Sequence, residues 1–459
     1  MEGNKLKSYL LAEHVSRLKY EQLPDVIKDA VRMSVLDYLA AAVAGWRINS
    51  GFNQATYEIV AEMGGIGDSS VLFCNDKKSP MNAAFLNAVY GHGADMDDGH
   101  RKAQGHVGVT VIPPVIALAQ NRHASYEDIA AAIVAGYDVY VRISEAVMPS
   151  HFIRGFHGTG TIGAIAAAAA SARVLRLDAE KTHQAMSIAA VQASGLIEVA
   201  ESGQEIKPIN PGNAARTGVF SALLAEKGVQ GPKDPLGGRN GFFRAFSDEA
   251  DAEKIVKDLG QKYSILTCYF KMYPACRHIH GAVDCGTKLH EMYGLTDERL
   301  IKVVRVFIYP AALKVVGAIR KPRDMSEAKF SLSYALAVSL LQGGYTLSDL
   351  WRAGKCPERI EKLIDKIIVA ADAALENRAA NIRGCRVEVE WMDGSIAREE
   401  VLLPKGDPEN PLTKEDLRAK LRVCADGFYS QEKMNTIFED ALSMSTADDV
   451  NRLFAVMEK

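Results

Sequence analysis

Apolar residues recur at helical spacing through the first half of the chain. Between residues 5 and 47 the pattern predicts helices, with Val31, Val35, Leu39 and Ala42 on one face. Gly45 follows this apolar run and is expected to end the helix there.

Five further helices are predicted in segments rich in alanine. Ser125 stands three residues before Asp128, which is a spacing typical of an N-cap. So much alanine lets helices approach closely, which favours a compact helical body. The predicted helices span residues 80–94, 112–119, 126–146, 161–175 and 178–194.

The pattern changes after about residue 265. Residues 300–310 and 383–404 are rich in valine and alternate between apolar and polar, which predicts strands. In the second of these segments the pair Asp393-Gly394 separates two alternating runs, as expected for a hairpin. A charged helix is predicted around residues 358–371, and the pattern is helical again from Thr413 onward.

The sequence therefore predicts a mainly α fold with two parts. Residues 1–267 and 405–459, from both ends of the chain, are expected to form a large helical domain. Residues 268–404 are expected to form a smaller α+β domain.

Composition narrows the class of protein. With 48% hydrophobic and 24% charged residues, the chain can build sizeable cores. A net charge of −3 gives no reason to expect nucleic acid or a membrane as partner. Seven scattered cysteines without a CxxC pair indicate reduced thiols, and the N-terminus lacks the apolar core of a signal peptide. A cytoplasmic protein is expected.

The most polar stretch is residues 92–114, HGADMDDGHRKAQGHVGVTVIPP. Its glycines predict a loop, and its dense charge of both signs suits a functional site. A solvated turn between two helices is the alternative. Because the loop runs directly into an apolar segment, we expect it to be held in place, as a catalytic loop must be.

Four other segments combine polar groups with glycine or proline. His157 precedes a predicted helix whose N-terminus suits a carboxylate. Gly158, Gly160 and Gly163 fit GxGxxG, but no strand precedes them, so a dinucleotide site is rejected. The remaining three segments are 202–218 with Lys207, 269–281 with Lys271, Cys276, Arg277, His278 and His280, and 324–337 with Lys329 and Tyr334.

Metal chemistry is a weaker alternative. Asp95, Asp97, Asp98 and His100 could ligate Mg²⁺ or Mn²⁺, but basic residues adjoin them and the other segments are cationic. Zinc at Cys276, His278 and His280 would lack a fourth ligand. No metal and no cofactor is therefore predicted.

The simpler hypothesis is a site of cations and imidazoles for a small anion with more than one carboxylate. Lysines would hold the carboxylates, and a histidine, lysine or aspartate would take a proton from the adjacent carbon. Taken singly, each such residue is as often structural. The five candidates are His106, His157, Lys207, Lys271 and His280.

Several motifs in order resemble those of the MmgE/PrpD family, which includes 2-methylcitrate dehydratase, cis-aconitate decarboxylase and iminodisuccinate epimerase. They are GHGADMDDGHRKAQGHVGVTVIP, GFHGTGTIGA, IKPINPGNAARTGV, KMYPACRHIH and AKFSLSYALAVSLLQGG. The resemblance implies a large helical domain, a smaller α+β lid domain with a cleft between them, a homodimer, and no metal or organic cofactor.

Matched motif by motif, the resemblance implies catalytic roles for Asp95, His106, His157, Lys207 and Lys271. The substrate contacts predicted beside these residues are Arg101, Cys276, Arg277 and His280.

Two positions depart from the family's pattern. The family often has Thr or Ser where this chain has Gly99, so a hydroxyl contact to substrate is missing there. Cys276 stands where the decarboxylase has a histidine, which argues against that activity.

We therefore expect a cofactor-independent lyase that acts on a small di- or tricarboxylate by α-proton abstraction, in the manner of a dehydratase. An epimerase or isomerase, or a decarboxylase, is the alternative. A catalytically inactive carboxylate-binding protein is a further hypothesis of another class.

Overall fold

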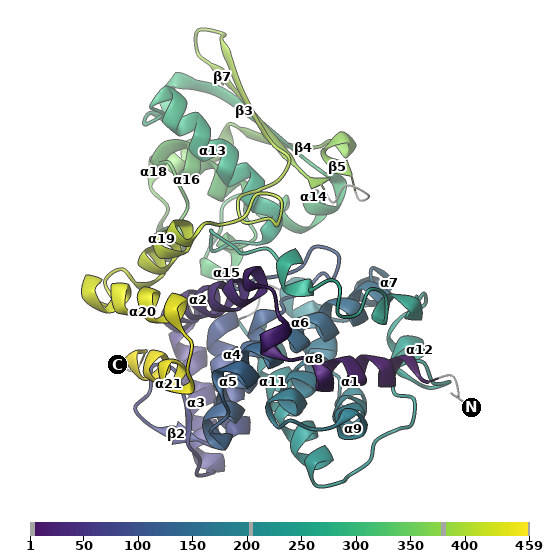
Figure 1. Cartoon of the computed structure of the whole chain (residues 1–459). Helices are drawn as coiled ribbons and strands as arrows, with labels where there is room; N and C mark the ends of the chain where they lie inside the picture. Colours follow the sequence, from purple (N-terminus) through teal and green to yellow (C-terminus); the bar gives the residue numbers. More distant parts are fainter. Residues whose placement is uncertain (1–4, 202–204, 378–381, 458–459) are drawn as a thin grey trace. The chain divides into compact units, whose positions relative to one another are not determined.

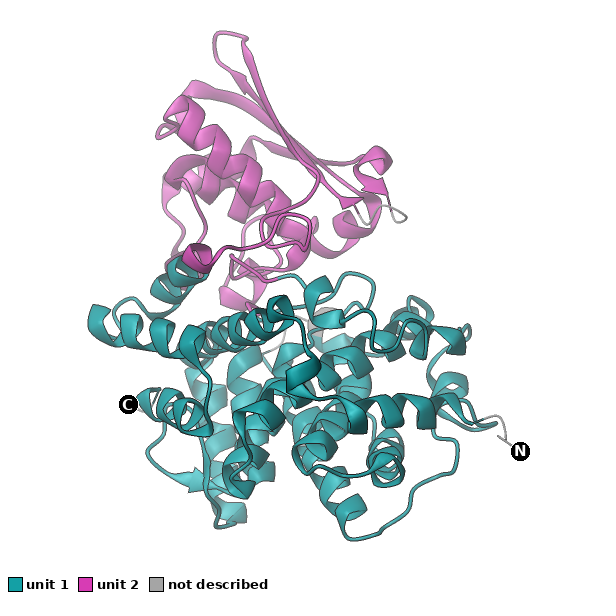
Figure 2. Ribbon diagram, viewed as in Figure 1, with its two compact units in different colours: residues 1–93, 97–269, 417–459 teal, residues 94–96, 270–416 magenta. Residues whose placement is uncertain are grey.

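The computed structural model describes residues 5–201, 205–377 and 382–457. The predicted mainly α fold is confirmed. The chain forms two compact units, coloured separately in Figure 2: unit 1 comprises residues 1–93, 97–269 and 417–459, and unit 2 comprises 94–96 and 270–416. All seven cysteines are free, and no helix among the described residues is long and apolar enough to cross a membrane.

Unit 1 contains both ends of the chain and is helical except for one short strand pair (Figure 1). Its helices are α1 Lys7–Arg17, α2 Asp25–Ile48, α3 Ser50–Met63, α4 Pro80–His92, α5 Gly108–Arg122, α6 Tyr126–Val147, α7 Ser150–Ile153, α8 Gly158–Val174, α9 Ala179–Ala190, α10 Glu198–Glu201, α11 Ile209–Glu226, α12 Phe242–Phe246, α19 Lys414–Ala425 (in unit 1 from Leu417 on), α20 Gln431–Ser443 and α21 Ala447–Val456; β1 Ser69–Ser70 pairs with β2 Lys77–Lys78.

The core of unit 1 is built around α8, in which every residue is buried. Alanine and glycine dominate α8, so the neighbouring helices α4, α5, α6 and α11 pack close to it or to one another. At Gly163 an added Cβ would lie 2.8 Å from Thr110 Cγ2 of α5. The alanine content therefore has the packing role that was expected of it.

A buried ion pair joins a C-terminal helix to an N-terminal helix within unit 1. Lys420 Nζ of α19 lies 2.6 Å from Asp37 Oδ1 of α2, and both side chains are at most 1% exposed. A charge buried this deeply is tolerated only when it is paired.

In unit 1 the helix predictions are confirmed in position, with one error. Ser125 caps α6 by accepting a hydrogen bond from the N–H of Asp128. Gly45 was expected to end a helix, but α2 continues to Ile48. Gly45 instead allows backbone contact with α4, since a Cβ there would overlap the carbonyl oxygen of Tyr90.

Unit 2 packs helices against a four-stranded sheet of order β4-β3-β7-β8. β3 is parallel to β4 and antiparallel to β7. Its elements are α13 His280–Tyr293, β3 Ile301–Ile308, α14 Pro310–Val316, α15 Met325–Ala328, α16 Leu332–Gln342, α17 Leu347–Arg352, α18 Glu358–Asp365, β4 Ile367–Ala371, β5 Glu376–Asn377, β6 Ile382–Arg383, β7 Cys385–Trp391 and β8 Ile396–Val401.

The hairpin at Asp393-Gly394 is confirmed, with Gly394 at φ +85° between β7 and β8. The helix predicted to reach residue 371 is wrong beyond Asp365. Residues Ile367–Ala371 instead form strand β4, which pairs with β3. The charged helix pattern ends before these residues, and the first three are β-branched, which favours a strand.

The backbone contact between α2 and α4 gives a stability prediction. Gly45→Ala is expected to lower the free energy of unfolding by about 1–3 kcal/mol, since the added methyl forces the two helices apart. Gly51→Ala is the matched control, because a Cβ at this exposed position in α3 meets nothing within 4 Å. The control should raise stability by about 0.5–1 kcal/mol. Thermal unfolding measures both changes, and equal shifts of the thermal midpoint in the two variants would contradict the prediction.

Candidate active site

The predicted polar loop joins α4 to α5 and is almost entirely buried. Among residues 93–107 only Lys102 is exposed and only Gln104 is half-buried. A solvated turn is therefore the wrong description. The loop is held inside the protein together with its charges.

Three glycines in and beside this loop make room for tyrosine rings in unit 1. A Cβ at any of them would collide with a tyrosine hydroxyl, so these glycines allow close packing. The pairs are Gly99 with Tyr269, Gly105 with Tyr140 and Gly108 with Tyr137. The departure at Gly99 thus leaves space that the phenol of Tyr269 takes up.

Asp98 fastens the loop to the start of α5. Its Oδ2 accepts a hydrogen bond from Tyr137 Oη at 2.6 Å, and its Oδ1 accepts one from the N–H of Gly108 at 2.8 Å. Burial raises the pKa of Asp98 to about 6, because these two hydrogen bonds only partly offset the loss of water. Asp98 therefore acts as an anchor of the loop.

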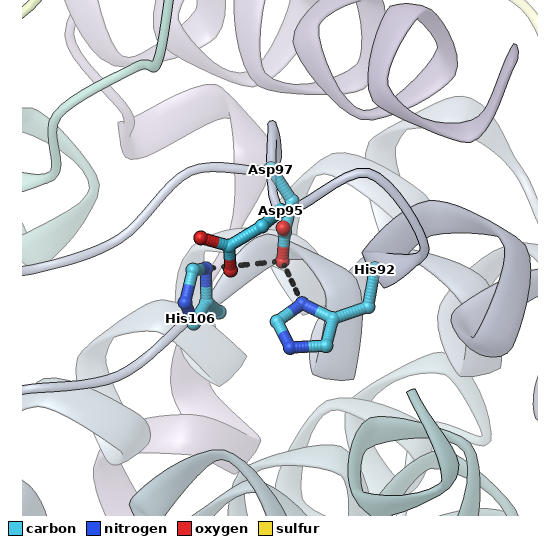
Figure 3. Close-up of side chains that lie close together, drawn as sticks. All are labelled: His92, Asp95, Asp97 and His106. Carbon is cyan, nitrogen blue, oxygen red and sulfur yellow. Dashed lines mark hydrogen bonds and ion pairs between the residues drawn. The ribbon is translucent and has the colours of Figure 1, made fainter. Parts of the chain in front are cut away.

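At the centre of the loop a single carboxylate oxygen lies between two imidazoles. Asp97 Oδ2 is 2.8 Å from Nδ1 of His92 and 3.2 Å from Nδ1 of His106 (Figure 3). Asp97 is 1% exposed and the side chain of His92 is fully buried. His106 Nδ1 also lies 2.9 Å from the carbonyl oxygen of Asp98.

Charge is distributed unequally in this group. Burial alone would raise the pKa of Asp97, but His106 and His92 lower it well below its ordinary value. Burial lowers the pKa of His92 to about 4, and the positive charge of Lys207 adds to this effect, while Asp97 only partly opposes it. Asp97 is therefore ionised and His92 neutral at neutral pH.

The same three side chains offer an arrangement that a divalent ion could use. One ligand atom from each of His92, Asp97 and His106 lies within 4.8 Å of the others. Within the described part of the chain, His92 Nε2 and Asp97 Oδ1 are buried without a hydrogen bond. The hydrogen bond from His92 and the nearby imidazole of His106 already compensate the charge of Asp97, so the cluster does not require an ion to be stable.

His157 lies beside this cluster at the N-terminus of α8. Its ring centroid is 6.3 Å from that of His92, and it is 3% exposed. Asn210 Nδ2 of α11 lies 2.9 Å from His157 Nδ1, and the N–H of His157 donates to the carbonyl oxygen of Gly195. Unit 1 thus brings together His92, His106 and His157.

The two predicted cations of unit 1 differ in exposure. Lys207 is half-buried in the turn before α11, and its charge acts on His92. Arg101 lies in the loop and is 4% exposed.

In unit 2, Lys271 is paired with Asp95. Lys271 Nζ donates to Asp95 Oδ2 at 2.8 Å and to the carbonyl oxygen of Asp95 at 2.7 Å. Asp95 has φ +56°, a left-handed conformation that aspartate tolerates better than most residues. Lys271 is 2% exposed, and these bonds use two of its three ammonium hydrogens.

The remaining predicted residues of unit 2 belong to an internal network. The guanidinium of Arg277 donates to Asp407 Oδ1 at 2.7 Å, to the carbonyl oxygens of Pro404 and Lys405, and to His280 Nδ1. His280 Nε2 lies 3.2 Å from the carbonyl oxygen of Ala275. Burial, Arg277 and Lys271 hold the pKa of His280 well below its ordinary value.

Both ring nitrogens of His280 are therefore engaged inside unit 2. Cys276 is half-buried and forms no disulfide. Its backbone N–H donates to the carbonyl oxygen of Lys329. Substrate contact by Arg101, Cys276, Arg277 and His280 stays a prediction.

Sequence reasoning left His92, Asp97 and Asn210 out of the candidate set. His92 ends α4 and Asp97 stands in the polar loop, and their closeness in sequence to Asp95 was the available signal. Nothing in the sequence marks Asn210 as the partner of a histidine 53 residues away.

Comparison with known proteins confirms the resemblance carried by the motifs. Residues 10–255 match the MmgE/PrpD N-terminal domain, and residues 273–444 match the MmgE/PrpD C-terminal domain. The chain is 27% identical to the cis-aconitate decarboxylase of Aspergillus terreus, over 96% of this chain and 94% of that protein.

Two further relatives show the spread of reactions. The chain is 24% identical to the cis-aconitate decarboxylase of Homo sapiens, over 97% of this chain and 93% of that protein. It is 26% identical to the 2-methylcitrate dehydratase of Salmonella typhimurium, over 52% of this chain and 51% of that protein. Since the two matched domains account for most of its length, the chain belongs to the MmgE/PrpD family.

Proposed function

We propose that this protein is a lyase that removes a proton next to a carboxylate of a small di- or tricarboxylic acid and then eliminates water. The observation that carries the proposal is the buried Asp97 carboxylate between two imidazoles, with a third imidazole beside them. A histidine held in this way has the geometry of a general base or a hydrogen-bond donor to the substrate.

The cations fit the same chemistry. Proton removal next to a carboxylate creates negative charge, which fixed positive groups stabilise in a site shielded from water. Lys207 in unit 1 and Lys271 in unit 2 are proposed to hold substrate carboxylates. Asp95 is a weaker candidate for the base than a histidine, because the ammonium of Lys271 occupies its Oδ2.

Decarboxylation is the second candidate. The similarity to cis-aconitate decarboxylases extends over nearly the whole chain, whereas that to 2-methylcitrate dehydratase covers about half of it. Cys276 in place of the decarboxylase histidine argues in the other direction. An epimerase would use the same proton abstraction and differ in where the proton returns.

A catalytically inactive carboxylate-binding protein is the hypothesis of another class. A scaffold has no need to place several imidazoles around a buried carboxylate. Burying a charge costs folding free energy unless partners compensate it. A homodimeric state, a cytoplasmic location and independence from cofactors belong to the proposal.

Reaction in D₂O tests the proposed function directly. The protein would be incubated with citrate, 2-methylcitrate, cis-aconitate and iminodisuccinate, and each mixture followed by NMR. Epimerisation and decarboxylation return a solvent hydrogen to the carbanion, and reversible proton removal exchanges the hydrogen before water is lost. Deuterium is therefore expected at the carbon next to a carboxylate in the substrate or the product. Loss of water, loss of CO₂ or inversion would identify the reaction. His106→Gln is the control, and no turnover or exchange of any of the four acids would favour the inactive alternative.

Chelation tests the role of His92, Asp97 and His106 as a hydrogen-bonded group. Because Asp97 has a hydrogen bond from His92 and the imidazole of His106 beside it, dialysis against a chelator is expected to leave both kcat and the thermal midpoint unchanged. Activity that disappears and returns with Mg²⁺, Mn²⁺ or Fe²⁺ would show that these residues hold a metal instead.

The two lysines should respond differently to exchange for methionine. Lys271→Met removes the ammonium that pairs with the buried carboxylate of Asp95, so it should lower the free energy of unfolding by about 3–5 kcal/mol as well as reducing activity. Lys207→Met should leave the thermal midpoint nearly unchanged. It should lower kcat/KM at least about tenfold, since a charge-assisted bond is worth roughly 1.5–3 kcal/mol.

The double variant Asp95→Asn with Lys271→Met is the matched control for stability. It removes both charges and should regain much of the lost thermal midpoint without regaining activity. Full activity in Lys207→Met, or an unchanged midpoint in Lys271→Met, would contradict these roles.

A further inference from the structure

We propose that Asp97 and Asn210 are positioning residues that fix His106 and His157 in opposite tautomers. In this arrangement Nε2 of His106 is unprotonated and takes the proton, and Nε2–H of His157 donates a hydrogen bond to the developing negative charge. This inference rests on the proposed function and names the separate tasks of the two histidines.

The tautomer of His106 follows from what surrounds its Nδ1. That nitrogen faces two acceptors, Asp97 Oδ2 at 3.2 Å and the carbonyl oxygen of Asp98 at 2.9 Å. Neither oxygen can donate a hydrogen, so Nδ1 must carry the proton. In the neutral ring Nε2 then has a lone pair, as a general base requires. The N–H of His106 donates to Thr159 Oγ1 at 3.2 Å, which holds its backbone as well.

The surroundings of His157 have the opposite polarity. Its Nδ1 lies 2.9 Å from Asn210 Nδ2, an amide nitrogen that can only donate. Nδ1 must therefore be the acceptor, and the ring proton is on Nε2. A second proton cannot be placed on Nδ1 while the amide faces it, so Asn210 keeps the ring neutral. A neutral imidazole that donates from Nε2 can stabilise an enolate-like oxygen without transferring its proton.

His92 supports the arrangement from the other side of Asp97. Its Nδ1 donates to the same Oδ2 at 2.8 Å, and its side chain is fully buried. The rings of His92 and His106 meet edge to face with centroids 4.6 Å apart (Figure 3). Because His92 holds the carboxylate of Asp97 in place, Asp97 remains an acceptor for Nδ1–H of His106, and Nε2 of His106 is left unprotonated.

The elimination balances with these groups alone. His106 Nε2 takes the hydrogen next to the carboxylate as a proton, and the electron pair stays on the substrate, where the Nε2–H of His157 stabilises it. That pair then forms the carbon–carbon double bond as the bond to the hydroxyl oxygen breaks. The leaving hydroxyl takes the proton back from His106 and departs as water, so both histidines end as they began.

Nitrogen NMR of the full-length protein measures both tautomers without turnover. With ¹⁵N-labelled histidine at neutral pH, we expect the unprotonated nitrogen to be Nε2 in His106 and Nδ1 in His157. The 11 histidines give overlapping signals, which His106→Gln and His157→Gln would assign by loss. A protonated Nε2 in His106, or a protonated Nδ1 in His157, would overturn the inference.

Asn210→Asp tests the positioning role at nearly constant shape. A carboxylate at this position accepts where the amide donated, so the proton of His157 should move to Nδ1 and kcat should fall at least about tenfold, with a smaller change in KM. Asn213→Asp is the matched control, since it adds the same charge to α11 where Asn213 contacts Arg216. An unchanged His157 signal in Asn210→Asp would overturn the role of Asn210.

Asp97→Asn provides the second variant. It should leave the His157 signal unchanged and lower kcat by about tenfold or more. The new amide can turn its NH₂ toward His106 Nδ1, where it competes with the accepting carbonyl of Asp98, so part of the His106 signal should move to the Nε2–H form. An unchanged kcat together with a single Nδ1–H form would overturn the role of Asp97. The proposed function fails separately from this inference. Tautomers as expected in a protein that turns over none of the four acids would reject only the lyase.

Discussion

The burial of one charge, that of Asp97, is the constraint on which the candidate site depends. A carboxylate that is 1% exposed loses most of its hydration, so hydrogen-bond donors must replace the water. Two imidazoles take the place of this water. The neutral ring of His92 donates from Nδ1 at 2.8 Å, and Nδ1 of His106 lies 3.2 Å from the same oxygen. The loop must therefore fold so that His92, at the end of α4, and His106, just before α5, reach the same oxygen.

The helices around the loop make this geometry possible. Gly45 lets α2 lie against the end of α4, and an added Cβ at Gly93 would in turn lie 2.8 Å from the Cα of Gly45. At the other end of the loop, Asp98 binds the first N–H of α5 and the hydroxyl of Tyr137. The polar loop is thus rigid because glycines admit its neighbours, although glycine in a sequence is usually taken as a sign of freedom.

Local pattern was enough to predict most of the helices, the hairpin and the mainly α class. Local pattern failed where residues distant in the sequence determine the secondary structure. Gly45 has the sequence context of a helix end, and only the approach of Tyr90 from α4 explains why the helix continues through it. Residues 367–371 adjoin a charged helix, and their pairing with β3 makes them a strand. Residue types at the candidate site could be predicted from motifs, but hydrogen-bond polarity could not, because Asn210 and Lys271 reach their partners across 53 and 176 positions.

Three buried charges share one feature, in that each is compensated by a neighbour within its own unit. Asp97 has two imidazoles beside it, Lys271 has the carbonyl oxygen and Oδ2 of Asp95, and Lys420 has Asp37. Groups fixed in this way cost little reorganisation when charge develops beside them, which is the condition for electrostatic catalysis. The same compensation limits what the site can accept. The carboxylates of Asp97 and Asp95 are compensated by His92 and Lys271, whereas the positive charge of Lys207 acts on the neighbouring His92. This charge distribution supports the polycarboxylate substrate that we propose.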